Sequence, residues 1–220
     1  GGAIATNQGT AVGYGATANS SEAFGESATA TRSSVAIGYY ARADENGVAV
    51  GEFAATETGT SVGYLSTSRL YGVSMGGEAA AGTSSVAVGY SCQADNRGVT
   101  VGNISLAINE GAAVGHQAQA RDNGVAVGAN AIGDVGGTAL GRGARGYPTN
   151  IAIGWNAEAI GGDKRIAIGV STTNEIDNSA VIRGTLYLDG ATGIQYRPTF
   201  GSGNWSNLFA SFIESDPRWA

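Results

Sequence analysis

The stretch GRGARG, residues 141–146, matches the G-x-G-x-x-G spacing that cradles the pyrophosphate of dinucleotides. That chemistry needs a helix opening at the glycines and an acidic residue further on, and neither pattern follows here. A second stretch, GGDKR at residues 161–165, is a single fragment of the nonapeptide that calcium-binding β-rolls repeat. We therefore expect no cofactor and no metal.

Two side chains could supply covalent or acid–base chemistry, namely Cys92 and His116, the only cysteine and histidine of the chain. A reactive thiol needs a neighbouring base, and none is adjacent to Cys92. His116 could act as a general base, as in hexapeptide-repeat acyltransferases, whose pattern resembles IGYYAR (37–42) and VGANAI (127–132). Those helices need about 18 residues per turn, whereas the period here is about 13. We expect no enzyme, and we keep the acyltransferase as a distant alternative.

The composition indicates a repetitive, ordered chain. Of its 220 residues 37 are glycine, against about 7% in ordinary proteins, but only three are proline, so collagen is excluded. A net charge of −6 argues against a nucleic-acid partner. No apolar run reaches the roughly 20 residues of a membrane span. The chain opens without Met, so we expect a processed chain or an excised segment, with any export signal or anchor outside it.

One phrase recurs along most of the chain, for example as SVAIGYYARA (34–43) and GVAVGANAIG (124–133). Its glycine recurs at spacings of 12 or 13 residues, with a last interval of 15. The thirteen copies are Gly13, Gly25, Gly38, Gly51, Gly63, Gly76, Gly89, Gly102, Gly115, Gly128, Gly141, Gly154 and Gly169. A short constant period is typical of a solenoid, in which every repeat is one turn.

The columns of the repeat predict two short strands per turn. The residue before each glycine is apolar in every copy, and residues three and five places after it are small. We expect an all-β parallel roll whose interior holds one large and one small side chain per layer. A tight corner belongs at Gly, Ser or Asn four places before the glycine.

The column two places before the glycine contains only Ala, Ser and Thr. Because side chains alternate along a strand, we expect this column to point outward. A free surface has no reason to exclude large polar residues from every turn, so the column predicts a close interface between copies. The predicted interface residues are Ala36, Ala49, Ser61, Ser74, Ala87, Thr100, Ala113, Ala126, Ala139 and Ala152.

These phrases, among them GVAVGEFAAT (47–56) and SVAVGYSCQA (85–94), resemble the YadA-like head (Hep/Hag) repeat of trimeric autotransporter adhesins. The resemblance covers residues 9–170. It implies a left-handed parallel β-roll, packed side by side as a homotrimer, that projects from a cell and adheres to host matrix or other cells. Similar repeats occur in bacteriophage fibre and capsid-surface proteins, so a virion structural protein is the alternative.

The pattern changes near the C-terminus, so we expect two parts. Residues 1–174 form the β-roll, and residues 175–220 form a small β-rich cap with a short helix around residues 206–214. The cap would protect the open end of the solenoid, or it would serve as a docking element or receptor-binding tip.

Aromatic residues recur just after the repeat glycine, where stacked turns would form a file of rings along one side. If the glycine turns a corner, these rings are exposed and suit contact with a glycan or protein. The candidate ligand-contact residues are Tyr14, Tyr39, Tyr40, Phe53, Tyr64, Tyr90, His116 and Trp155. The expected function is attachment to host matrix, a glycan or a bacterial cell-surface receptor. The expected location is extracellular, on a bacterial surface or a virion.

Overall fold

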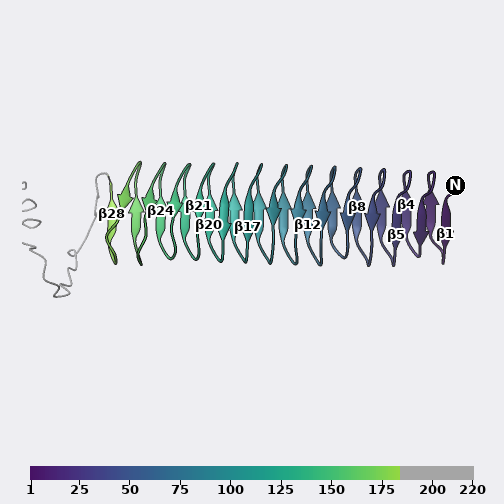
Figure 1. The fold of residues 1–220 in the computed structure, drawn as a ribbon, viewed down its shortest axis with the longest axis horizontal. Helices are drawn as coiled ribbons and strands as arrows, with labels where there is room; N and C mark the ends of the chain where they lie inside the picture. The colour runs from purple at the N-terminus through teal and green to yellow at the C-terminus, as the bar shows by residue number, and fades with distance from the viewer. Residues whose placement is uncertain (184–220) are drawn as a thin grey trace, which may run out of the picture. The chain divides into compact units, whose positions relative to one another are not determined.

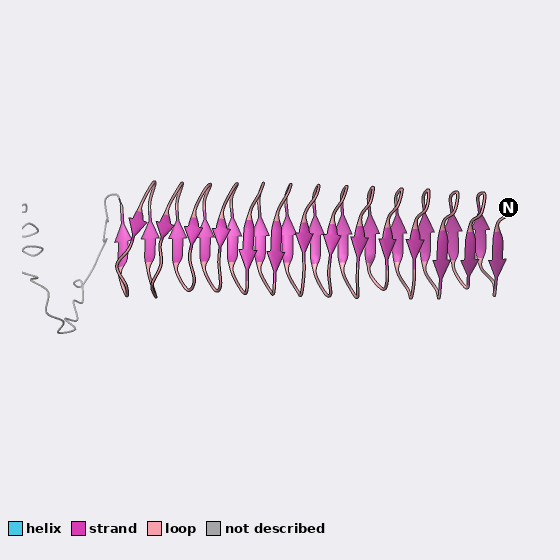
Figure 2. Ribbon diagram, viewed as in Figure 1, coloured by secondary structure: helices cyan, strands magenta, loops and turns pink. Residues whose placement is uncertain are grey.

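The computed structural model describes residues 1–183, and these residues form a parallel β-solenoid of two sheets (Figure 1). Each turn contributes one strand to each sheet, and the chain alternates between the two sheets (Figure 2). The fold is all-β in the described part of the chain, as the period predicts. No helix among these residues is long and apolar enough to cross a bilayer.

The odd-strand sheet has fourteen strands in sequence order. They are β1 (Ile4–Thr6), β3 (Thr17–Asn19), β5 (Thr29–Thr31), β7 (Arg42–Ala43), β9 (Ala55–Thr56), β11 (Thr67–Ser68), β13 (Ala80–Ala81), β15 (Gln93–Ala94), β17 (Leu106–Ile108), β19 (Gln119–Arg121), β21 (Ile132–Gly133), β23 (Arg145–Gly146), β25 (Glu158–Ala159) and β27 (Thr173–Asn174).

The even-strand sheet also has fourteen strands. They are β2 (Thr10–Val12), β4 (Glu22–Phe24), β6 (Val35–Ile37), β8 (Val48–Val50), β10 (Thr60–Val62), β12 (Val73–Met75), β14 (Val86–Val88), β16 (Val99–Val101), β18 (Ala112–Val114), β20 (Val125–Val127), β22 (Thr138–Leu140), β24 (Ile151–Ile153), β26 (Ile166–Ile168) and β28 (Ala180–Ile182).

The register is vertical, so each column of the sequence repeat becomes a file of side chains along the solenoid. Val35 pairs with Val48, and Ala36 pairs with Ala49, one turn later. The same pairing continues with Ala126 and Ala139 near the other end of the sheet. A property shared by one column is therefore a property of one continuous strip.

The interior is built from small side chains contributed by both sheets. In the turn of β6 and β7, Ala36, Ala41 and Ala43 are at most 1% exposed, and equivalent positions repeat this along the chain. Ala and Ser fill most of these positions, and the largest fully buried side chains are Asn150, Asn174, Thr100 and Cys92. The expected pairing of one large and one small side chain per layer is therefore wrong.

The predicted interface column faces the opposite way from the expectation. All ten of its residues are fully buried within the single chain, so they cannot contact another copy: Ala36, Ala49, Ser61, Ser74, Ala87, Thr100, Ala113, Ala126, Ala139 and Ala152. Strand alternation defines two faces but does not say which is inside. Here the face with the smaller side chains, Ala, Ser and Thr, is the interior, and the larger Val and Ile side chains lie on the outer face.

The repeat glycine turns a corner between an even strand and the next odd strand. Gly38, for example, has φ = +132°, and a Cβ atom there would collide with the carbonyl oxygen of Gly51 in the next turn. Both the backbone angle and the space therefore require glycine. This stacking fixes the position of the residues that follow each glycine.

The solenoid continues beyond the predicted boundary at residue 174. Strand β28 (Ala180–Ile182) pairs in parallel with β26, so residues 175–182 complete a last turn. The rest of the predicted cap, with its helix at 206–214, lies outside the described residues.

Candidate binding surfaces

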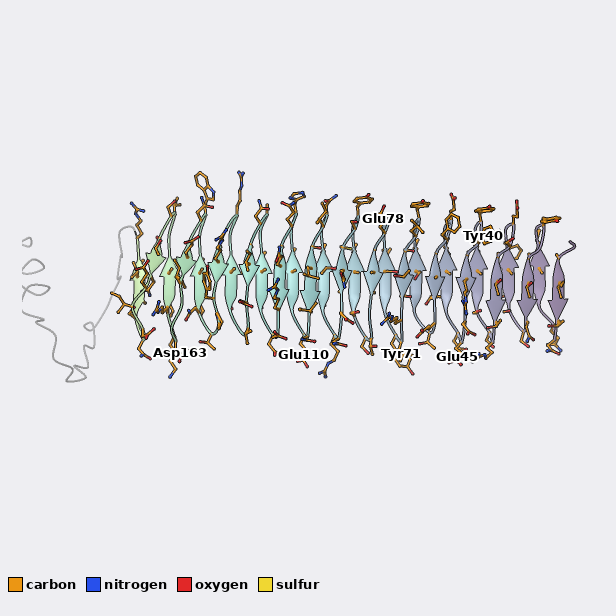
Figure 3. All side chains as sticks on the ribbon, in the orientation of Figure 1. Tyr40, Glu45, Tyr71, Glu78, Glu110 and Asp163 are labelled. Atoms are coloured by element: carbon orange, nitrogen blue, oxygen red, sulfur yellow. The ribbon has the colours of Figure 1, made fainter. Side chains whose placement is uncertain are left out.

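The glycine corners, defined as the two residues after each repeat glycine, form one edge of the solenoid. Tyr40 and Glu78 mark this edge in Figure 3, whereas Glu45, Tyr71 and Glu110 mark the opposite one. Backbone hydrogen bonds join successive corners. The Tyr40 amide donates to the Glu26 carbonyl at 3.0 Å, and the next turn repeats this bond. The scaffold thus holds these side chains at a regular spacing.

All eight candidate ligand-contact residues lie on glycine corners and are exposed in the chain: Tyr14, Tyr39, Tyr40, Phe53, Tyr64, Tyr90, His116 and Trp155. Exposure is what a contact surface requires. The structure brings only part of the set together, because ring contacts join Tyr39, Tyr40, Phe53 and Tyr64 alone, and the other candidates lie on separate turns.

Four of these rings form a cluster. The centroids of Tyr39 and Tyr40 are 4.5 Å apart in an edge-to-face arrangement, and those of Tyr40 and Phe53 are 5.7 Å apart and stacked. Tyr64 extends the cluster, with its centroid 6.4 Å from that of Phe53. Such pairs add stability beyond the burial of their area, and here they also hold the rings in fixed orientations. The sequence shows these aromatic residues but not their mutual geometry.

Carboxylates surround the rings and affect their ionisation. Desolvation is the main cause that raises the pKa of the Tyr39 hydroxyl. Tyr40 and the carboxylates of Glu26 and Glu52 raise this pKa further. The Tyr90 hydroxyl donates to Glu78 at 3.1 Å, and this bond raises the pKa of Tyr90. Tyr39 and Tyr90 are therefore neutral hydrogen-bond donors near neutral pH, lying beside negative groups.

The residues singled out for chemistry do not converge. Cys92 is buried and donates to the Gly89 carbonyl at 3.4 Å, and burial raises the pKa of its thiol. His116 lies on an outer corner of a different turn. Gly141 is one of the repeat corner glycines, and Arg145 lies in a strand rather than a helix. Within residues 1–183, no group of three or more His, Cys, Asp or Glu side chains could hold a metal ion.

The outer face of the even-strand sheet is a second surface, which the sequence reasoning missed. Its two columns are mostly Val, Ile and other apolar residues, interrupted by Thr10, Glu22, Thr60 and Thr138, and many of the apolar residues are more than one-third exposed. The most exposed are Val12, Phe24, Ile37, Met75, Val99, Val101, Val114, Val127, Ile153 and Ile182. Because the columns are vertical, these residues form one apolar strip along the sheet, and a strip of this kind marks an interaction site. The signal was present in the apolar column before each glycine.

The opposite corners, between an odd strand and the next even strand, form ion pairs with one another. Arg32 forms ion pairs with Asp44 and Glu45, and Arg97 pairs with Glu110. Asn109 donates to Asp122 at 2.6 Å one turn later. These contacts join successive turns and neutralise part of the charge on this edge.

Comparisons with known proteins give no family assignment. No protein-family model matches the chain, and no curated protein matches it significantly.

Proposed function

We propose that this chain is a non-enzymatic, homotrimeric segment of a fibre that attaches to host or cell surfaces. The observation that carries the proposal is the row of exposed aromatic side chains on the glycine corners. A rigid repeat scaffold presents them at constant spacing, and rigid amphipathic rings give contact area at low entropic cost. The partner would be a matrix component, a glycan or a cell-surface receptor.

The apolar strip on the even-strand sheet supports the homotrimer. A strip of Val and Ile running the length of a sheet is costly to leave in water, and covering it with copies of the same chain removes it from solvent. Copies lying side by side have the same length and the same turn spacing, so their strips match along the whole solenoid. The resemblance to the YadA-like head repeat is the basis for proposing three chains per assembly and a left-handed roll.

The proposed location is outside the cell, on a bacterial surface or on a virion. A virion structural protein with the same repeat remains the second proposal, and it shares the trimer and the strip. The two differ in what the fibre attaches to.

The test replaces Tyr39, Tyr64 and Tyr90 together by Ser and measures both particle mass and attachment to cells or matrix proteins. We expect an intact assembly with at least tenfold weaker attachment. The matched control replaces Leu70, Tyr71 and Ile176, three exposed apolar residues away from the glycine corners, and should attach normally. Unchanged attachment of the first variant would reject the glycine corners as the adhesive surface.

A further inference from the structure

The first seven glycine corners alternate between an aromatic ring and a carboxylate, turn by turn. The series runs Tyr14, Glu26, Tyr39, Glu52, Tyr64, Glu78 and Tyr90, and Glu78 differs only in being the second residue of its corner. None of these seven corners carries a Lys, Arg or His. We name this series the Tyr–Glu row.

The repeat itself does not require this pattern. The next six corners, from Asn103–Ile104 to Val170–Ser171, contain no Asp or Glu and include Arg142 and His116. Their backbone turns in the same way, with Gly102 and Gly141 at φ = +145° and +134°. The carboxylates are thus a property of the first half of the edge and not of the fold.

The carboxylates of the Tyr–Glu row lack partners of opposite charge. In the described part of the chain no ion pair involves Glu26, Glu52 or Glu78, although Glu78 accepts hydrogen bonds from Tyr90 and from the Ser91 hydroxyl. On the opposite corners, by contrast, Glu45 and Glu110 each pair with an arginine. Arginines thus neutralise some of the acids on the opposite edge, whereas no ion pair neutralises any of the three glutamates of the row.

The spacing of the row matches an extended polypeptide. Parallel strands lie about 4.8 Å apart, so tyrosines on alternate turns lie about 9.6 Å apart along the edge. A polyproline II helix has three residues per turn and rises about 3.1 Å per residue, so every third side chain points the same way at about 9.3 Å intervals. The two periods stay in step over the length of the row.

We propose that the Tyr–Glu row binds an extended, proline-rich polypeptide with a basic residue at every third position. Each basic side chain would stack on a tyrosine face and pair with the neighbouring carboxylate. The proline rings would lie between successive tyrosines, as aromatic surfaces bind proline-rich segments elsewhere. This proposal rests on the proposed attachment function and specifies its partner.

The test measures binding of a labelled (Arg-Pro-Pro)₄ peptide to the full chain by fluorescence anisotropy. The comparison peptide has the same twelve residues with its four arginines contiguous. We expect the periodic peptide to bind at least fivefold more tightly. Equal affinities would overturn the proposal, because the match between the peptide period and the row would then contribute nothing to binding. Absence of binding by the periodic peptide would overturn it as well.

A pair of triple variants tests the site. Glu26, Glu52 and Glu78 are changed to Gln in one, and Glu57, Glu110 and Glu175, away from the glycine corners, are changed to Gln in the other, so the net charge changes equally. The first should lose at least tenfold in affinity for the periodic peptide and the second less than twofold. Equal losses would contradict a specific site. If cells still attach to the first variant but not to the tyrosine variant, this inference fails while the proposed function stands.

Discussion

The two faces of the even-strand sheet use the same strands for opposite purposes. In β20 the central Ala126 is fully buried inside the solenoid, whereas Val127 beside it is 40% exposed on the outer face. In most globular proteins the larger apolar residue faces the core. Here the interior is so narrow that volume decides, and the larger residue is placed outside.

A column in which small residues recur from turn to turn therefore indicates something different from a column in which large apolar residues recur. A column limited to Ala, Ser and Thr marks the interior, where close packing penalises larger side chains. A column of Val and Ile marks a surface that the single chain does not cover. We therefore expect substitutions on the outer face to affect assembly and substitutions on the inner face to affect folding.

The largest effect should come from a charge on the inner face. Ala126→Glu would bury a carboxylate among alanines with no partner, which costs at least several kcal/mol. We expect a weaker β signal in circular dichroism and a much lower unfolding midpoint. The matched control Val127→Glu places the same charge one residue away on the outer face and should keep the β signal. Equal unfolding by both variants would contradict the distinction between the faces.

A pair of charges on the outer face should break assembly without unfolding the chain. In Val114→Glu combined with Val127→Glu, two adjacent turns place carboxylates in the apolar strip. Because the residues are exposed in the single chain, the fold should persist while copies repel one another. Sedimentation should then detect particles of smaller mass. An unchanged mass would indicate that the interface lies on another face of the solenoid.

The sequence was sufficient to predict much of this fold but not the direction of its faces. The period, the strand pairs, the parallel stacking and the glycine corners follow from recurring residues such as Gly38 and Gly51. The inward direction of Ala36 does not follow, because alternation is symmetrical and the distance between the sheets is a tertiary property. Similarly, Tyr39, Tyr40 and Phe53 are evident in the sequence, but their edge-to-face and stacked contacts depend on how neighbouring turns align.

A smaller effect should come from the hydroxyl of Thr100, which lies between Ala87 and Ala113 in the inner column. Among the described residues, its oxygen is the one buried side-chain polar atom without a hydrogen-bond partner. Thr100→Val keeps the shape and removes the unsatisfied group, so it should stabilise the chain by about 1 kcal/mol. Chemical denaturation measures this difference. A destabilised variant would show that the hydroxyl has a partner, such as the neighbouring Cys92 thiol.

The smallest effect concerns the last turns. Arg165 donates to the Asp177 carboxylate from Nε at 2.8 Å and from Nη2 at 2.6 Å, and this bonding lowers the pKa of Asp177 below its ordinary value of 3.8. A lowered pKa in the folded state gives stability above the unfolded-state pKa, and that stability disappears as the pH falls through the folded pKa. The unfolding midpoints of wild type and Asp177→Asn should therefore differ at pH 6, and the difference should shrink as the pH falls below the ordinary pKa of 3.8. A difference that is independent of pH would contradict the ion pair.

The central claim is that the apolar strip on the even-strand sheet is covered by two further copies of the chain. Light scattering on the unmodified protein at micromolar concentration tests it most directly. We predict a particle of three chains whose mass stays constant on dilution through that range. A stable monomer would show that the strip is left in water, and it would contradict the claim.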